Sequence, residues 1–282
     1  MTASETTSQP PARTKPSRRR EAGFYFAIVC LGLMALVCVM SLFWTPHDPI
    51  DFITDDAFAP PSAVAWLGSD YLGRDVLSRL LDGTRITLFM AFAATFLAHL
   101  IGGSLGLFAA ARGGPLDMIV SRIVDVVLSL PKIIVGLVVL AALGPSIPVI
   151  IIMAAIVYAA GVFRIARALG NDVTRLEFIE IARSRGEGTA WIIFGEMLPH
   201  VIRPLAADFA IRTSFAILFM SSLSFVGLGV QPPMADWGGM AHENIAGLST
   251  NPFASIIPAL AIALVAVSLN LIVDATERKV KW

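Results

Sequence analysis

Six long apolar runs divide this sequence, and each is near the length at which a helix crosses the hydrocarbon layer of a membrane. A helix rises about 1.5 Å per residue, so about 20 residues are needed to cross about 30 Å. Hydrophobic residues make up 56% of the 282, which is too many for one or two water-soluble domains. The sequence therefore predicts an all-α membrane protein with six transmembrane helices, at about 24–44, 84–111, 118–142, 147–163, 205–226 and 254–273.

The basic residues orient these spans. Residues 1–20 lack apolar periodicity and end in three arginines, so they are predicted to be a disordered basic tail in front of a transmembrane domain over 21–282. With the tail in the cytoplasm, 16 of the 21 Lys and Arg residues lie on the cytoplasmic side if Arg122, near the cytoplasmic end of the third span, is included. Three lie in the loop after the first span up to Arg85, and Lys132 and Arg212 lie deeper within spans. Because cytoplasmic loops are enriched in Lys and Arg, we expect both termini to be cytoplasmic.

The loops on the opposite side are unequal. Residues 45–82 contain seven aspartates but only two arginines, and four prolines block a long helix until about Leu72, which predicts a short extracytoplasmic cap. Residues 144–146 are so short a link that the third and fourth spans should form a tight helical hairpin. The last outer loop covers 227–253.

The cytoplasmic loop 164–203 is far longer than a helix connection requires and carries six arginines among apolar residues. Its pattern predicts two short helices joined by a corner at Gly186, with the second ending before Pro199. Such helices could lie in the lipid interface or dock into the groove of a partner. In the docking interpretation Gly186 supplies the turn, Ala182 lets two backbones approach, and Glu180 pairs with a basic partner residue or caps the second helix.

In this loop, Glu180-Ile181-Ala182, then Gly186 after three residues, then Leu198-Pro199 resemble the coupling loop of binding-protein-dependent ABC importer permeases. Two other stretches resemble the dipeptide, oligopeptide and nickel branch of this family: 67–79 (LGSDYLGRDVLSR) and 225–233 (FVGLGVQPP) with Trp237-Gly238. Importers of this branch contain two different permeases, and the chain resembles the second, or "C-type", permease. The chain departs from the branch at Ile181, which replaces a central alanine, and at 195–200, where GEMLPH stands in place of Arg-His-Ile-Leu-Pro-Asn.

The resemblance implies a type I ABC importer permease fold in the bacterial inner membrane, with Glu180, Ala182, Gly186, Leu198 and Pro199 as the coupling residues. It implies four kinds of partner: a second homologous permease in a heterodimer, two ABC ATPase subunits, an extracytoplasmic solute-binding protein, and membrane lipid. ATP and magnesium would bind the ATPase subunits, and this chain would bind no cofactor and catalyse no reaction. The solute would be peptide-like or a chelate, and nickel chelate, opine and glutathione-like solutes remain open.

The sequence itself agrees with a transport subunit that lacks its own ATPase. No Gly-Lys-Ser or Gly-Lys-Thr occurs, and the longest soluble segment is too short for a nucleotide-binding domain. The composition gives no nucleic-acid footprint, and the four histidines lack the spacing of a metal site. One rival is an intramembrane hydrolase, because residues 102–106 match Gly-x-Ser-x-Gly and His99 lies one turn earlier. The same residues also form Gly-x-x-x-Gly, and we favour that helix-packing interpretation.

Polar residues within the spans are costly in lipid and normally face protein or a water-filled path. The candidate translocation-path residues are Arg122, Asp125, Ser129, Lys132, Asp208 and Arg212. On one continuous helix the first four would lie within about 80° of one another and form a polar stripe. We expect Arg122 to pair with Asp125, Asp208 to pair with Arg212, and Lys132 to contact either Asp208 or the solute.

Overall fold

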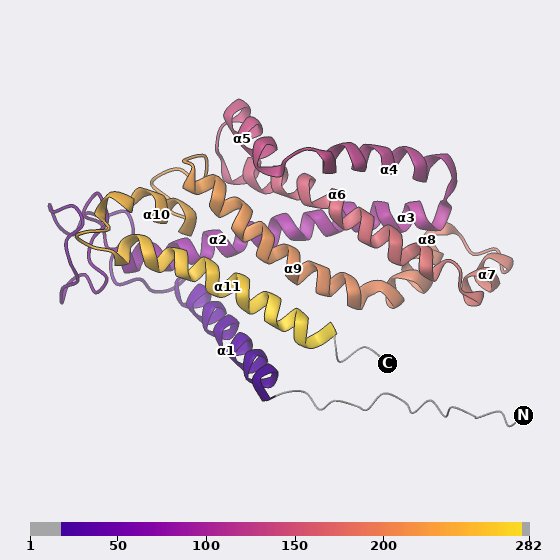
Figure 1. The fold of residues 1–282 in the computed structure, drawn as a ribbon, viewed down its shortest axis with the longest axis horizontal. Helices are drawn as coiled ribbons and strands as arrows, with labels where there is room; N and C mark the ends of the chain where they lie inside the picture. Colours follow the sequence, from indigo (N-terminus) through magenta and orange to yellow (C-terminus); the bar gives the residue numbers. More distant parts are fainter. Residues whose placement is uncertain (1–17, 278–282) are drawn as a thin grey trace, which may run out of the picture.

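The computed structural model describes residues 18–277 and is almost entirely helical over that range (Figure 1). The elements are α1 (Arg18–Met40), α2 (Val76–Ala98), η1 (His99–Gly103), α3 (Ser104–Arg112), α4 (Gly114–Ser129), α5 (Lys132–Leu143), α6 (Ile147–Val173), α7 (Glu177–Ser184), α8 (Thr189–Trp191), η2 (Ile192–Met197), α9 (Leu198–Phe225), α10 (Trp237–Glu243), η3 (Ile245–Gly247) and α11 (Phe253–Glu277). Within residues 18–277 no strand forms, which confirms the all-α fold class.

Five continuous helical stretches are long and apolar enough to cross a membrane: Ala22–Met40, Val76–Arg112, Ile147–Val173, Thr189–Phe225 and Phe253–Thr276. A sixth crossing is available only if α4 and α5 are counted as one span, although an angle of 87° separates their axes. The prediction of six apolar spans therefore holds with one of them broken. Residues 1–17 of the predicted tail at 1–20 lie outside the described residues. Arg18–Arg20, the end of that predicted tail, belong to α1.

The break corrects the predicted continuous span at 118–142. Leu130 has ψ 134° and Pro131 has ψ 116°, so two residues in extended conformation separate α4 from α5. A proline disfavours the helical conformation in the residue before it and has no backbone N–H to continue the helical ladder. The tight link at 144–146, in contrast, is as expected, because α5 ends at Leu143 and α6 begins at Ile147.

Three other spans are longer than predicted. The second begins at Val76 rather than about 84, because Asp75 caps it by accepting a hydrogen bond from the backbone N–H of Ser78 at 3.0 Å. The fourth continues from 163 to Val173, and the fifth begins at Thr189 rather than 205. Charged residues at these ends lowered the apolar content of the sequence without ending the helix.

The core of the bundle lies between α2, α6 and α9, with residues such as Met90, Ala154 and Ile217 almost fully buried. The continuous helix α2–η1–α3 crosses α6 at very short range. A Cβ placed on Gly102 would lie 2.2 Å from the carbonyl oxygen of Ala159, and one on Gly106 would lie 2.7 Å from that of Phe163. The packing interpretation of Gly-x-x-x-Gly is confirmed.

Figure 1 shows that the two kinds of loop lie at opposite ends of the long axis. The cap loop, defined here as residues 41–75, lies with α10 at one end, and α7 lies at the other. The N-terminal end of α1 and the C-terminal end of α11, which pack beside each other, both point away from the cap loop. The cap loop and the loop 164–203 are therefore separated by the length of the bundle.

Candidate functional site

The first arm of the loop 164–203 is α7, an amphipathic helix with one face buried. Ile179 and Ala182 are fully buried, and Ile179 belongs to a cluster that includes Leu107 of α3 and Met197 of η2. Glu180 is exposed and Ile181 is 58% exposed on the opposite face. This corrects the expected role of Ala182, because its side chain faces its own chain rather than a partner. The outward side chains of α7 are the ones that a partner can reach.

The glycine corner forms as predicted and requires glycine for its backbone. Gly186 has φ +82°, a conformation that residues with a side chain rarely adopt. The N–H of Gly186 donates to the carbonyl of Arg183 at 2.9 Å, and the N–H of Glu187 donates to that of Ala182 at 3.2 Å, which ends α7. A Cβ on Gly186 would meet nothing within 4 Å, so the space beside it is open.

The second arm does not end before Pro199, and that prediction is wrong. The chain is helical from Thr189 to Phe225, and a π-helical turn over Ile192–Met197 immediately precedes the proline. Pro199 lies inside this continuous helix and directly follows the π-helical turn, where the regular α-helical hydrogen-bond pattern is already interrupted. Glu180 does not cap this arm, since α8 has Gly188 at its N-cap and no side-chain hydrogen bond there. The arm is therefore a direct extension of a membrane span.

Two of the residues that depart from the family pattern, Glu196 and His200, connect the second arm to the first. The ring of His200 stacks on Phe178 of α7 at 4.8 Å between centroids. The carboxylate of Glu196 lies 3.7 Å from the guanidinium of Arg185. Through these contacts the divergent segment 195–200 connects α7 to the N-terminal end of α9.

The predicted polar stripe is wrong, because its members lie on two helices. Arg122, Asp125 and Ser129 lie on α4 and are exposed, whereas Lys132 begins α5 beyond the 87° bend. Among the described residues no ion pair joins Arg122 to Asp125, and the Ser129 hydroxyl donates to its own helix. The ion pair that does hold α4 was not predicted. Asp117 of α4 accepts two hydrogen bonds from Arg167 of α6, at 2.5 and 2.6 Å.

Beside that ion pair lies a small polar cavity of about 360 Å³ between α4 and α6. Its lining residues are Ser121, Val124, Asp125, Phe163, Arg164, Arg167 and Ala168. Asp125 thus faces the arginines of α6 instead of Arg122. Both signs of charge line this cavity, which suits a path for polar or zwitterionic molecules.

A second charged cluster joins three helices in the middle of the bundle. Arg212 donates through Nε to Asp208 Oδ2 at 2.5 Å, which confirms the predicted pair. His99, at the start of the π-helical turn η1, brings Nε2 to 3.2 Å from the same oxygen. The Arg212 guanidinium lies against α6, since a Cβ on Gly161 would be 2.6 Å from Nη1. The histidine considered for a hydrolase is therefore a partner of Asp208.

Lys132 lies apart from Asp208. Its ammonium nitrogen is 4.8 Å from the centroid of the Tyr158 ring, and the tyrosine hydroxyl donates to the carbonyl of Phe215 at 2.9 Å. A contact between Lys132 and Asp208, which was one of two expectations, is not among the ion pairs of the described residues. Ser104, the candidate nucleophile, lies on a continuous helix and not on a strand-to-helix turn.

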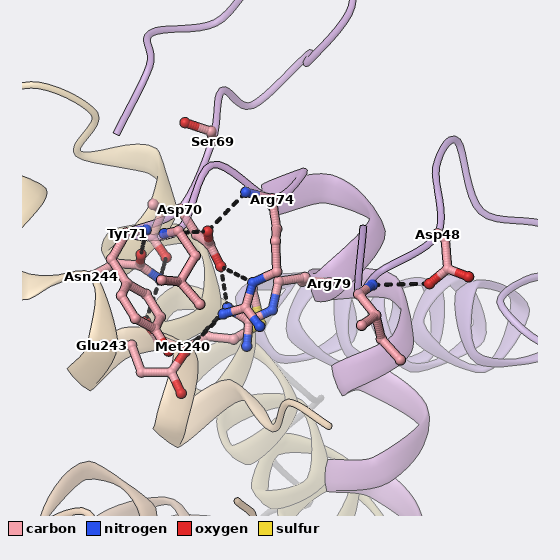
Figure 2. A network of polar contacts seen from close by, with 12 residues as sticks. Asp48, Ser69, Asp70, Tyr71, Arg74, Arg79, Met240, Glu243 and Asn244 are labelled. Carbon is pink, nitrogen blue, oxygen red and sulfur yellow. Dashed lines mark hydrogen bonds and ion pairs between the residues drawn. The ribbon is translucent and has the colours of Figure 1, made fainter. Parts of the chain in front are cut away.

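At the cap end, a buried ion-pair network connects the cap loop to α10 (Figure 2). Asp70 Oδ2 accepts from Arg74 Nε at 2.8 Å and from Arg79 Nη1, and Arg79 also donates to Glu243 at 3.1 Å. Asn244, which follows α10, accepts from the backbone N–H of Tyr71 at 3.1 Å. The cap loop and α10 therefore form one unit, although more than 160 residues separate Arg79 from Glu243.

Trp237, from the second family-like stretch, contacts α2 just after the end of the first stretch. The backbone N–H of Trp237 donates to the Thr87 hydroxyl at 3.1 Å, and the indole N–H donates to the Leu80 carbonyl at 3.4 Å. Asp236 caps α10 by accepting from the N–H groups of Gly238 and Gly239. Burial raises the pKa of Asp236 to about 6, and the nearby carboxylate of Glu243 adds to that rise.

Comparison with known proteins agrees with this geometry. The family model described as "Binding-protein-dependent transport system inner membrane component" matches residues 102–282. The chain is 35% identical over 251 residues to the glutathione transport system permease protein GsiD of Pectobacterium atrosepticum, with 87% of this chain and 83% of that protein covered. It is 35% identical over 214 residues to the dipeptide transport system permease protein DppC of Alkalihalophilus pseudofirmus, with 76% and 70% covered.

A third relative is the probable D,D-dipeptide transport system permease protein DdpC of Escherichia coli, which is 32% identical over 246 residues, with 87% of this chain and 83% of that protein covered. Two of these relatives are named as permeases for dipeptides and one as a permease for glutathione. The family match begins within η1 and includes the loop 164–203 and the Asp208–Arg212 pair, whereas His99 precedes it. The chain belongs to the family of binding-protein-dependent transport system inner membrane components, and it is a multi-pass permease subunit of the bacterial inner membrane.

Proposed function

We propose that this chain forms half of the translocation path of an ATP-driven importer for peptide-like solutes, which an extracytoplasmic binding protein delivers. The observation that carries the proposal is the corner α7–Gly186–α8, which projects at one end of the bundle and continues into α9 without a break. A push on this corner moves a membrane span directly. Family membership implies ATPase and binding-protein partners in general.

The finer composition of the complex is part of the proposal. A second, homologous permease completes the path as a heterodimer, and two ATPase subunits bind ATP and magnesium, so this chain needs no cofactor of its own. Both termini and the loop 164–203 face the cytoplasm, while the cap loop faces the binding protein. The positions of Lys and Arg support this orientation, because 16 of the 21 then lie on the cytoplasmic side.

The mechanism is alternating access. ATP-driven closure of the ATPases moves the exposed face of α7, which carries Glu180, and the corner at Gly186. Leu198 and Pro199 at the base of α9 receive the motion, because His200 and Glu196 bind α7 on either side of them. Tilting of α9 against α6 then opens the path first outward and afterwards inward.

The solute class follows from the relatives. Their printed names are dipeptide, D,D-dipeptide and glutathione permeases, all of which handle small molecules with peptide bonds and carboxylates. We assign a peptide-like solute to this chain, and a glutathione-like one is equally compatible. Nickel chelates and opines share the same polar, carboxylate-bearing character. The acidic and basic residues between α4 and α6 support a polar path, with Arg122, Asp125 and Ser129 on its α4 side.

The test is affinity purification of the complex from detergent-solubilised membranes, with mass spectrometry and an ATPase assay. Wild type should bring down an ATPase and a second permease. Gly186→Trp should lose the ATPase and keep the second permease, because the bulky side chain fills the open side of the corner. Gly188→Ala is the matched control, since Gly188 has φ −74° and a Cβ there meets nothing within 4 Å. Recovery of the wild-type chain alone would refute the importer proposal.

A further inference from the structure

Lys132, at the start of α5, is a further basic residue that lies outside the charged cluster of His99, Asp208 and Arg212. Asp208 is the carboxylate of that cluster. That carboxylate already serves both Arg212 and His99 through one oxygen, Oδ2. Among the described residues no ion pair includes Lys132. An ammonium within a membrane span costs about 2.5–3.5 kcal/mol and normally finds a partner, so this position calls for an anion.

The ammonium of Lys132 is held in place by a ring and not by an acid. It lies 4.8 Å from the centroid of the Tyr158 ring, which is within the range of a cation–π contact. The ring is itself fixed, because its hydroxyl donates to the Phe215 carbonyl at 2.9 Å and Phe219 packs edge-on at 5.8 Å. A cation–π contact uses one face of the ammonium, so N–H donors remain for an incoming acceptor.

The position is also accessible. Lys132 is exposed at the 87° bend between α4 and α5, whereas the side chains of Asp208 and Arg212 are only 10% and 12% exposed. Lys132 is therefore open to a molecule that approaches α5, whereas the Asp208–Arg212 pair is largely enclosed by the bundle. The two cations thus differ in use: Arg212 is neutralised inside the bundle, and Lys132 is presented outward.

We propose that Lys132, held on the Tyr158 ring, binds the carboxylate of the solute during its passage through the membrane. This inference rests on the proposed import of peptide-like solutes and assigns their free carboxyl group to a subsite at the start of α5. Lys132 supplies a compact positive charge on a flexible stem, and that charge is what the carboxylate would bind. The class of ligand is a small molecule with an unblocked carboxylate, such as a dipeptide.

The experiment uses the complete importer with its binding protein in proteoliposomes and measures uptake per ATP hydrolysed. Lys132→Met should lower dipeptide uptake about tenfold while assembly and stimulated ATPase activity persist, and Lys132→Arg should retain most uptake. Lys132→Cys, made with Cys30→Ala and Cys38→Ala, should be as defective as Lys132→Met and should recover when aminoethylation restores a cation. Uptake by Lys132→Met at the wild-type level, or no recovery on aminoethylation, would overturn the proposal.

A second readout identifies the carboxylate. In Ile133→Cys, made with Cys30→Ala and Cys38→Ala and with Lys132 kept, a dipeptide should slow labelling of the thiol, and the C-terminal amide of the same dipeptide should not; Ile133 is suitable because it is 51% exposed on the same helix turn. The matched control adds Lys132→Met to this variant, and its thiol should be labelled equally with either peptide. Equal protection by acid and amide, or none, would contradict a carboxylate subsite. Failure of the proposed function is distinguishable, since the wild-type complex would then lack both uptake and stimulated ATPase activity.

Discussion

Asp70→Asn should cause the largest loss of stability among the single isosteric changes in the cap loop. The side chain of Asp70 is 0% exposed and accepts four hydrogen bonds: from the backbone N–H groups of Leu72 and Arg74 at 2.8 and 2.9 Å, from Arg74 Nε, and from Arg79 Nη1. The two arginine side chains are only 4% and 1% exposed. Removing the charge leaves both guanidinium groups to share Glu243, as Figure 2 makes visible.

The magnitude follows from the cost of an unbalanced buried charge. Breaking a buried ion pair from one side costs about 3–5 kcal/mol in the free energy of unfolding. Several nitrogens of Arg74 and Arg79 already lack a hydrogen-bond partner among the described residues, so no spare acceptor is at hand. Asp55→Asn on the same loop is the control, since Asp55 is exposed and should change stability by less than about 0.5 kcal/mol.

The assay is thermal unfolding of the solubilised protein together with protease sensitivity of the cap loop. Asp70→Asn should melt well below wild type and expose the loop to cleavage, while Asp55→Asn should match wild type. Adding Arg79→Met to Asp70→Asn should recover part of the loss, because it removes the stranded charge. If Asp70→Asn has the same melting temperature as Asp55→Asn, the ion-pair network does not stabilise the cap loop and the reasoning is refuted.

Three further predictions test other parts of the bundle. Gly102→Ala should lower the free energy of unfolding by about 1–3 kcal/mol, because the new Cβ would lie 2.2 Å from the Ala159 carbonyl oxygen. Gly32→Ala is the control, since a Cβ on Gly32 would meet nothing within 4 Å. Equal melting temperatures for the two variants would contradict the close helix crossing. Asp236 has a pKa raised to about 6 in the folded protein, so the folded state binds its proton more tightly than the unfolded state does. Its contribution to the free energy of unfolding is complete below about pH 4 and is lost as the pH rises through about 6. Asp236→Asn should flatten that dependence in melting curves between about pH 5 and pH 7.5, and an unchanged slope would exclude this carboxyl as its source. Asp117→Asn should release α4 from α6 and speed hydrogen exchange along α4, with exchange in α11 unchanged; protection of α4 at the wild-type level would show that its ion pair is dispensable.

The apolar runs predicted most of the fold, because the length and composition of a segment determine whether it can cross a membrane. They predicted the ends of helices poorly. The second span begins at Val76 through the cap provided by Asp75, in a stretch where Arg79 and Asp82 make the sequence look like a loop. Arg79 is acceptable there because Asp70 and Glu243 neutralise it. No spacing in the sequence relates Arg79 to Glu243, so tertiary contacts decided this boundary.

In the loop 164–203 the sequence motif predicted a feature of the backbone, whereas the packing of α7 determines which side chains are exposed. Gly186 was predicted from a motif, and the positive φ that explains it is a local property of the backbone. The roles of its neighbours depend on which face of α7 is buried. Ala182 belongs to the buried face with Ile179, and Ile181 belongs to the outer face. Helical periodicity alone permits this assignment, but the family motif drew attention to Ala182 instead of to the residues that a partner can reach.

The break at Leu130 and Pro131 changes which polar residues of the third span lie together. Hydropathy averages over Leu130 and Pro131, so 118–142 reads as a single span with a single polar face. The restriction that a proline places on the preceding residue indicates a break at that point, and Leu130 does adopt ψ 134°. The break rotates α5 away from α4, which separates Asp125, facing the arginines of α6, from Lys132, facing Tyr158. The single predicted stripe is therefore two separate polar positions, and the one at Lys132 lacks a carboxylate of its own among the described residues. If the proposed path runs past Lys132, this arrangement favours a solute that carries a carboxylate.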